Sequence, residues 1–547
     1  MKKLLPFTLI MGFLIIATPA FAAEYYIDAQ NGSDSNTGIT EDAPWQNLSK
    51  ISGSVLSAGD TVYLKGEFTP AATVSLDSAG TSGNVITINN WPDETPEIKI
   101  INGNSFLVNG NYHDFNGLTF HNDSVVNTNS TAISYGNGIG FSTVSECIFR
   151  DGKVGIGGAG LNGFFNFKQN TFTNFSNAGV KFESNDANLI IENNIFFNDP
   201  SGSSFGLYLV NASLVEIENN TFYNLGYPIV AFASSSVDVY NNIFSSNTAA
   251  INTTVSGLAN CNYNLFYNNS NVGILWPVQS YGSLAEWQTL GYDANSLEED
   301  PSFISTTSGS ENFYLNPISA AIDTGTAVLG IAEDFDGAIR PQGEAYDIGA
   351  YEYATIPEHL QITQTNPKKL SLSWDETCTG CTYTLSYAIN EDFTENDNNL
   401  ENLPATDQEV TGLIPAKPYY WKVKAYNGAR YSSYTESLKA PTKPLKVKKI
   451  KHLSQYATGE SVKIRWKKYK RIRNYRVLLY NSKNKKIRTI KIKKTRKFVQ
   501  GKKKYVKKTI KNLKPDKKYR VKVRARKKVD ETWYNGKFSK RIRAKTL

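Results

Sequence analysis

The 547-residue chain is too long for one ordinary hydrophobic core, so its length predicts several domains or a repeat architecture. Its net charge of +9 hides a sharp division: residues 441–547 carry 42 basic and 4 acidic residues, whereas residues 24–440 carry 15 basic and 46 acidic ones. This division excludes an evenly charged surface and predicts a C-terminal part that binds polyanions by releasing their counterions.

The N-terminus has the order of a cleavable secretory signal. Lys2 and Lys3 precede an apolar run over residues 4–16, and Ala20-Phe21-Ala22 offers the small residues of a cleavage site. We therefore predict a signal peptide over residues 1–22 and a secreted, extracellular or cell-surface mature chain. No later stretch is apolar for long enough to cross a bilayer, so no transmembrane span is expected in the mature chain.

The front of the mature chain has the pattern of a cap. A strand is predicted over residues 25–28, and Pro44 is expected to open a short helix that turns Trp45, Leu48 and Ile51 toward the end of a core. The intervening loop is rich in side-chain oxygens. Its carboxylates could hold a Ca²⁺ ion, although the same residues also make good turns; the two that carry the metal hypothesis are Asp28 and Asp34.

A phrase of the form Asn-Asn-Xaa-Phe recurs through the middle of the chain. Steps of 23, 24, 26, 22 and 22 residues separate its register positions, which are Cys147, Asn170, Asn194, Asn220, Asn242 and Asn264. Each step is one turn of a parallel β-solenoid whose stacked coils bury a continuous core. Asn side chains at the same bend should bond along their own column, and the Phe two residues later should stack inside.

A second column follows four residues beyond the first, at Asn174, Asn198, Asn224 and Asn268, and Asp151 also falls in it. The default role of Asp151, as of the asparagines in this column, is hydrogen bonding at a turn. Lys168 and Glu192 each lie two residues before the first column, so we expect them to be neighbours on adjacent coils, more as a structural pair than as catalytic groups.

The solenoid and its two ends resemble a known family. The opening over residues 25–50, the Asn-Asn-Xaa-Phe coils, and the close at residues 334–337, 340–341 and 347–353 look like the pectate-lyase-like right-handed β-helix proteins of bacterial surfaces. The resemblance covers about residues 24–353. It implies the fold and a role with polysaccharides but no particular activity, because that superfamily includes lyases, hydrolases and members with no known chemistry.

Beyond Pro357 the pattern changes to that of β-sandwiches. The strand ending in Trp374 and the corner and strand over residues 413–426 resemble a fibronectin type III module, and a basic copy follows with Trp466 and residues 513–525. Cys378 and Cys381 are close enough to form a loop disulfide in an exported protein. The sequence thus predicts an all-β chain: a right-handed parallel β-helix over residues 23–354, then immunoglobulin-like, fibronectin type III sandwiches over residues 357–440 and 445–547.

One group of candidate site residues lies after the second bend of the coils. Alternation in the segment Val180-Lys181-Phe182-Glu183 buries the apolar residues and points Lys181 and Glu183 outward together. The preceding coil offers glycines there, and the following coil supplies a sugar-stacking ring. We therefore predict a shallow trough with catalytic candidates Lys181, Glu183 and Asp151, and with substrate-binding candidates Tyr208, Arg150 and Lys153. The plainer interpretation is a solvated ion pair of Lys181 and Glu183 beside glycines that a turn of the backbone requires.

Three functions compete. The first is a polysaccharide-recognising β-helix whose basic module, over residues 441–547, holds an anionic cell-envelope polymer. The second is an enzyme, either a polysaccharide lyase using a base such as Lys181, or a glycosidase pairing Asp151 with Glu183 or Asp186. The scarcity of converging cations and carboxylates favours recognition. Specific nucleic-acid binding is disfavoured because the chain is expected to be exported and has no nucleic-acid motif.

Overall fold

The computed structural model describes residues 22–547 except residues 102, 123–129, 184–185, 199–201, 235, 255–257, 379, 396, 494–497, 501–502 and 530. The predicted signal peptide lies almost entirely outside the described residues. The chain divides into two compact units, Met1–Tyr353 and Ala354–Leu547. Among the described residues, no helix is both long and apolar enough to span a membrane.

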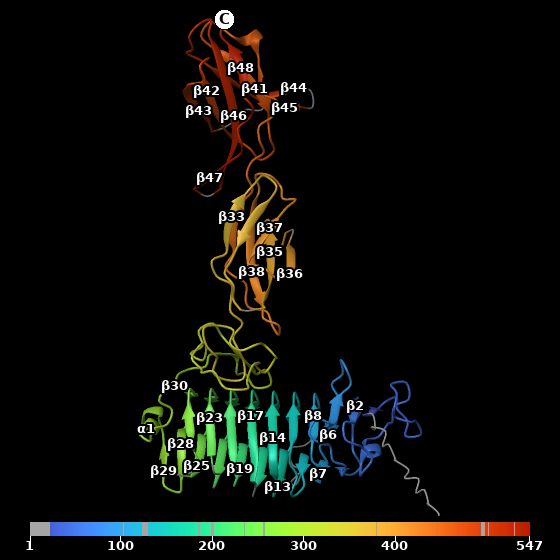
Figure 1. Cartoon of the computed structure of the whole chain (residues 1–547). Helices are drawn as coiled ribbons and strands as arrows, with labels where there is room; N and C mark the ends of the chain where they lie inside the picture. Colours follow the sequence, from blue (N-terminus) through green and yellow to red (C-terminus); the bar gives the residue numbers. More distant parts are fainter. Residues whose placement is uncertain are drawn as a thin grey trace, which may run out of the picture. The chain divides into compact units, whose positions relative to one another are not determined.

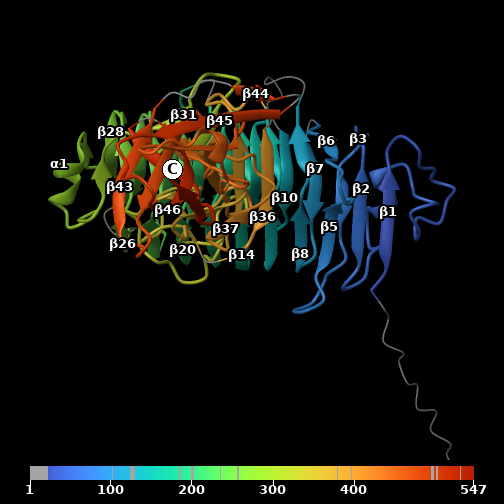
Figure 2. The same ribbon diagram turned by 90° about the horizontal axis from the view of Figure 1, so that it is seen from above.

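The described part of the first unit is a right-handed β-helix built from three ten-stranded sheets, and all their strand pairs are parallel except β28–β29 (Figures 1 and 2). Sheet A consists of β1 (Glu24–Asp28), β2 (Thr61–Lys65), β5 (Ile86–Asn90), β8 (His113–Asn116), β11 (Ser142–Ser145), β14 (Asn162–Lys168), β17 (Asp186–Glu192), β20 (Leu214–Glu218), β23 (Ser236–Tyr240) and β26 (Asn260–Asn262). Sheet B consists of β4 (Val74–Leu76), β7 (Gly103–Val108), β10 (Ser130–Tyr135), β13 (Val154–Ala159), β16 (Ala178–Glu183), β19 (Phe205–Val210), β22 (Tyr227–Phe232), β25 (Ala249–Thr254), β28 (Asn271–Trp276) and β29 (Gln279–Tyr281). Sheet C consists of β3 (Glu67–Phe68), β6 (Glu97–Lys99), β9 (Thr119–His121), β12 (Ile148–Arg150), β15 (Thr171–Thr173), β18 (Ile195–Phe197), β21 (Thr221–Tyr223), β24 (Ile243–Ser245), β27 (Leu265–Tyr267) and β30 (Leu297–Glu298).

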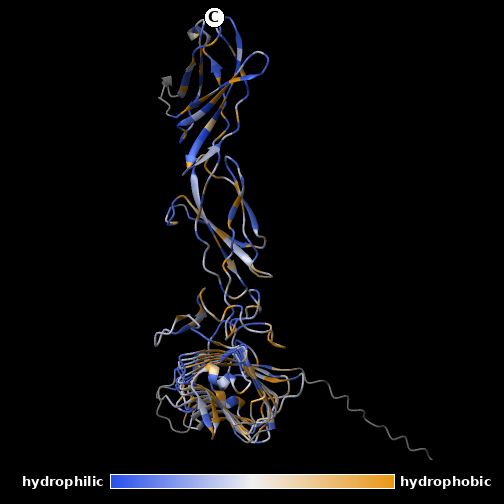
Figure 3. Cartoon of the chain, turned by 90° about the vertical axis from the view of Figure 1, so that its left-hand side faces the viewer, coloured by the Kyte–Doolittle hydropathy of each residue, from blue (hydrophilic) through white to orange (hydrophobic). Residues whose placement is uncertain are grey.

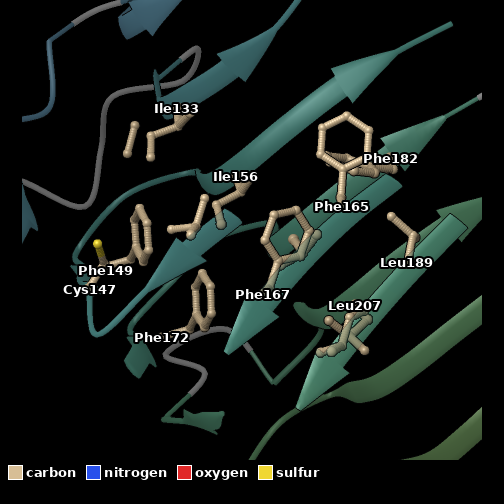
Figure 4. Packing of buried hydrophobic residues seen from close by; sticks show 14 of the residues in the cluster. Ile133, Cys147, Phe149, Ile156, Phe165, Phe167, Phe172, Phe182, Leu189 and Leu207 are labelled. Carbon is tan, nitrogen blue, oxygen red and sulfur yellow. The ribbon is translucent and has the colours of Figure 1, made fainter. Parts of the chain in front are cut away.

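The repeated Phe forms a stack inside sheet C, as predicted. Ring centroids of neighbouring members lie 4.6–5.3 Å apart and the rings are nearly parallel; the members are Phe120, Phe149, Phe172, Phe196, Phe222, Phe244 and Phe266. Figure 4 shows Phe149 and Phe172 with Ile156 and Phe167 in the same interior. The spacing matches that of adjacent strands, so one residue per coil supplies one layer of core.

The predicted asparagine column is also present. Asn194 donates its backbone N–H and its side-chain amide to Oδ1 of Asn220, at 2.8 and 3.0 Å, and Asn170 and Asn242 continue the pattern on either side. In the second column the backbone is left-handed at Asp151, Asn174, Asn198, Asn224 and Asn268, where φ lies between 53° and 63°. Short polar side chains tolerate this conformation best, which explains the residue types.

The N-terminal cap differs from its prediction. Trp45, Leu48 and Ile51 are buried, as predicted. The prediction of a helix that begins at Pro44 is wrong, because only Leu48–Ile51 is helical and it is a 3-10 turn. The backbone of Trp45 is instead extended. It donates to the carbonyl of Tyr26 and accepts from the N–H of Asp28 at 2.9 Å each, so it extends sheet A and cannot be helical. At the other end, helix α1 (Leu284–Gln288) buries Trp287 against the last coil.

The closing segment, residues 320–353, follows the short hairpin of β31 (Phe303–Ser305) and β32 (Asn312–Leu315). Arg340 and Glu352 form an ion pair of 2.6 Å there, and both side chains are fully buried. Asp334 accepts hydrogen bonds from the backbone N–H groups of Asp336, Ala338 and Glu352. These carboxylates therefore tie the segment together.

The second unit holds two β-sandwiches. The first consists of β33 (Gln361–Thr365), β34 (Leu370–Ser373), β35 (Thr382–Ala388), β36 (Asn398–Leu403), β37 (Asp407–Val410), β38 (Pro418–Tyr426) and β39 (Leu438–Pro441). The second, called the basic module, consists of β40 (Lys451–His452), β41 (Val462–Lys467), β42 (Asn474–Tyr480), β43 (Lys486–Ile492), β44 (Phe498–Gln500), β45 (Lys503–Ile510), β46 (Lys518–Val529), β47 (Thr532–Asn535) and β48 (Ile542–Lys545), with a 3-10 turn at Ser454–Tyr456.

Both sandwiches have the features that the sequence predicted. Trp374 and Trp466 are buried, and the hydroxyls of Tyr419 and Tyr519 each accept a backbone N–H five residues upstream, at 2.9 and 3.0 Å. This hydrogen bond is the tyrosine corner of such folds. Cys378 and Cys381 form a disulfide. In the basic module hydrophilic residues alternate with buried apolar ones, so the charged side chains belong to the strands of a folded sandwich (Figure 3).

Candidate functional site

A hollow of about 540 Å³ lies on the outer face of sheet B, over β10, β13 and β16, and we call it the trough. Lys153, Lys181 and Glu183 are among its lining residues. Strand alternation produces this arrangement, because Val180 and Phe182 are fully buried and their neighbours must point outward. The trough therefore collects three of the six residues predicted to act in catalysis or substrate binding.

Lys181 lines the trough, and its ammonium group contacts two neighbouring side chains. Its Nζ lies 3.4 Å from Oε2 of Glu183 and 5.5 Å from the ring centroid of Tyr208. Lys181 and Tyr208 are direct cross-strand partners on β16 and β19. A carboxylate and an aromatic face thus hold one ammonium group in place, and about a third of the lysine side chain remains exposed.

The floor beside Lys181 is formed by small residues. Gly157 is its cross-strand partner on β13, and Ser134 is the partner of Gly157 on β10. A Cβ atom at Gly157 would lie 3.3 Å from Cγ2 of Thr131, a tight contact. The glycine thus keeps the floor of the trough low.

Aromatic rings extend the site away from the floor. The ring of Phe205 lies 5.0 Å from Tyr208 and 5.8 Å from Tyr227, measured between centroids, and we call these three residues the aromatic platform. Sequence reasoning found Tyr208 but missed Phe205 and Tyr227. Aligning the coils would have found them, because Ala178, Phe205 and Tyr227 occupy one register position on β16, β19 and β22.

Two predicted residues lie elsewhere. Arg150 belongs to β12 of sheet C, where its guanidinium lies 3.2 Å from Glu97. Asp151 occupies the second column and accepts a hydrogen bond of 3.0 Å from the side chain of Asn174. Neither lines the trough. Arg150 ends the sheet C strand and Asp151 begins the bend that leads to sheet B, and position along the sequence alone did not reveal on which side of that bend their side chains fall.

The two candidate metal ligands make turns in the structure. Asp28 accepts hydrogen bonds from the backbone N–H groups of Gln30 and Asn31, and Asp34 accepts from those of Gln46 and Asn47, at 2.8–3.0 Å. Burial raises the pKa of both carboxyls, but these hydrogen bonds outweigh burial and lower it. Within the described ranges, no three His, Cys, Asp or Glu side chains form a group suited to a metal ion.

A row of carboxylates on sheet A escaped the sequence reasoning; it consists of Glu192, Glu216, Glu218 and Asp238. Lys168 and Glu192 are cross-strand partners, as predicted, and Glu192 is in turn the partner of Glu218. Glu218 is only 8% exposed. Burial, and then repulsion by Glu216, Glu192 and Asp238, raises its pKa to about 8. Only the three-dimensional structure reveals this burial.

Comparison with known proteins agrees with the architecture. Residues 143–280 match the family described as right handed beta helix region, and residues 355–440 match the fibronectin type III domain. The chain is a right-handed β-helix protein with fibronectin type III-like modules. The family match to the β-helix includes β13, β16, β19 and β22, which carry the trough and the aromatic platform.

The similar proteins cover smaller parts of the chain. Lacto-N-biosidase of Bifidobacterium longum subsp. longum is 35% identical over 80 residues, which are 14% of this chain and only 5% of that enzyme. A two-domain fibronectin type III segment of chicken tenascin is 21% identical over 35% of this chain and 99% of its own, with a TM-score of 0.25. The FN1–FN3 domains of chicken CNTN1 are 14% identical over 36% of this chain and 69% of their own, with a TM-score of 0.21.

Proposed function

We propose that this chain is a secreted or cell-surface protein whose β-helix recognises a polysaccharide through the trough and the aromatic platform. The observation that carries the proposal is the placement of Lys181, held by Glu183 and Tyr208 at the edge of a hollow with a glycine floor. The β-helix match and the partial similarity to a lacto-N-biosidase support a carbohydrate-related function.

The chemistry of the site fits a sugar chain that carries acid groups. Aromatic rings offer broad apolar faces on which the C–H faces of sugar rings can pack, and an ammonium group offers donors and a positive charge for a carboxylate. Lys153 adds a second cation to the lining. Phe205 on β19 and Tyr227 on β22 follow β16 in the order of sheet B, so a polymer that crosses the strands of the trough can continue over their rings.

The basic module supplies attachment to an anionic cell-envelope polymer in this proposal. Its net charge is +38, and its outward residues on β41, β42 and β46 are mostly Lys and Arg. Binding by counterion release weakens as salt rises. Deleting residues 441–547 should therefore abolish salt-sensitive retention on an anionic envelope; retention that survives the deletion at low salt would contradict this part of the proposal.

Bond cleavage in the same trough is the second candidate function. Once deprotonated, Lys181 could take the proton beside the carboxylate of a bound uronate, as a polysaccharide lyase requires, and Glu183 lies beside it on the same strand. The similarity to part of a lacto-N-biosidase supports a glycosidase as the other form of this candidate. Asp151 is turned to Asn174 and is a poor partner for Glu183 in such a reaction.

One experiment separates recognition from cleavage. The mature chain is incubated with acidic and neutral polysaccharides, with and without Ca²⁺, while unsaturated-uronate absorbance, new reducing ends and polymer binding are followed. Binding without either product supports recognition. Appearance of either product would replace recognition by catalysis, and absence of both binding and products across the panel would contradict the proposal.

A further inference from the structure

The outer face of one sheet of the basic module carries an ordered row of cations and aromatic rings. Arg526 lies 3.9 Å from the Trp533 ring centroid, and Phe538 is shared by Arg524 at 4.6 Å and Lys522 at 4.7 Å. Tyr480 is likewise shared by Lys522, at 5.3 Å, and Arg541, at 4.3 Å. We call the four cations with their three rings the cation ladder; its cations are Lys522, Arg524, Arg526 and Arg541.

The strands explain this geometry. Lys522, Arg524 and Arg526 alternate with buried Val521, Val523 and Ala525 on β46, so all three point to the same face. Arg476 on β42 is the direct cross-strand partner of Arg524 and adds a fifth cation beside the ladder. Ring contacts hold the long side chains extended, which lowers the conformational entropy that a ligand would otherwise have to remove.

The ladder lacks compensating negative charge. Within the described ranges, none of its four cations forms an ion pair with a carboxylate; the two acidic residues paired in the basic module, Asp516 and Glu531, contact Lys545 and Lys528 instead. The Nε atoms of Arg476 and Arg524 are buried and have no hydrogen-bond partner. Burial, followed by repulsion from Arg476, lowers the pKa of Arg524. A bound anion would relieve this repulsion.

We propose that the cation ladder is the binding site for the anionic envelope polymer, and that this polymer is a chain of phosphate diesters joined by polyol or sugar units. The inference rests on the proposed attachment function and names its site and ligand. Alternate residues of a strand are about 7 Å apart, and the six bonds from one phosphate to the next across a three-carbon linker span about the same distance. Successive phosphates can therefore meet Lys522 and Arg524 in turn, whereas Arg526 is only 7% exposed and is held by Asn535 and Trp533 at the end of the row.

Nucleic acid has a similar backbone spacing but fits the ladder less well. Proteins that bind single strands without sequence preference stack bases on exposed aromatic faces. Cations already lie over Trp533, Phe538 and Tyr480, so these rings order the charges and offer less surface to a base. Guanidinium groups, whose planar forks pair with phosphate oxygens in a bidentate manner, occupy three of the four ladder positions.

The test measures binding of the full mature chain to polyglycerol phosphate by calorimetry over a range of salt concentrations. One triple variant carries Lys522→Gln, Arg524→Gln and Arg541→Gln in the ladder. Its matched control carries Lys451→Gln, Lys467→Gln and Lys511→Gln, which remove the same charge at exposed positions outside the ladder. We expect a loss of about 30-fold or more for the ladder variant, a salt slope reduced by about two to three, and less than about threefold loss for the control.

The outcomes are separable. Equal weakening by both triple variants would overturn the ladder while leaving attachment by net charge intact, whereas no binding by the unmodified chain would contradict the proposed attachment itself. Tighter, ladder-dependent binding of single-stranded DNA than of polyglycerol phosphate would overturn the ligand. If the ladder variant unfolds, Arg524→Lys with Arg541→Lys keeps the charge but removes the guanidinium forks; unchanged affinity in that variant would also overturn the inference.

Discussion

Asn194 and Asn220 are joined by two hydrogen bonds to a single atom, because the backbone N–H and the side-chain amide of Asn194 both donate to Oδ1 of Asn220. Asn220 in turn donates its own amide to the carbonyls of Ile191 and Glu218. One buried side chain therefore satisfies polar groups of two adjacent coils, and the column is an internal framework for the solenoid.

Replacing Asn220 by Ala should destabilise the β-helix strongly. The change leaves several buried donors and acceptors without partners, and we expect the free energy of unfolding to fall by about 3–5 kcal/mol. Calorimetry of the full chain, following the β-helix transition, measures the effect. Asn260→Ala is the control, since this residue is exposed and its amide donates to Asp238, and a similar loss in both variants would contradict the framework role.

The buried ion pair of Arg340 and Glu352 should be sensitive to removal of one partner. Arg340→Met leaves an uncompensated carboxylate in the closing segment, so we expect a loss of about 3–5 kcal/mol in the free energy of unfolding. Lys65→Met breaks the partly exposed Lys65–Glu94 pair and should cost less than about 1 kcal/mol. Equal losses in these two variants would show that the buried pair does not hold the closing segment.

Glu218 should make the β-helix less stable as the pH rises. Its pKa is about 8 in the folded chain and near 4.5 when unfolded, so between these values the folded state holds the extra proton and stability falls with increasing pH. Glu218→Gln should flatten the fall between pH 5 and pH 8.5 and raise the melting temperature at pH 8.5. Glu67→Gln, at an exposed position, is the control; parallel pH profiles for the Glu218 variant and the unmodified chain would disprove the assignment.

The coils could be predicted from the sequence because each repeats a local rule: an asparagine at the bend and a phenylalanine two residues later. The site could be predicted only in part. Lys181, Glu183 and Tyr208 follow from alternation within single strands, whereas Phe205 and Tyr227 require the exact register between coils. The high pKa of Glu218 depends on its burial and on three carboxylates from neighbouring strand positions, none of which local sequence expresses.

In the proposed function, the β-helix binds an acidic polysaccharide at Lys181 and the aromatic platform. The most direct measurement is the affinity of the full chain for the polysaccharide that binds best, compared among Lys181→Ala, Tyr208→Ala and Lys65→Ala. Lys65 is a matched control, because it also contacts a carboxylate, Glu94, and an aromatic ring, Trp91, but lies on sheet A. We expect the Lys181 and the Tyr208 variant each to weaken binding about tenfold, a loss of about 1.4 kcal/mol, and the control to leave it unchanged. Unchanged affinity in both the Lys181 and the Tyr208 variant, or an equal loss in the control, would contradict binding at this site.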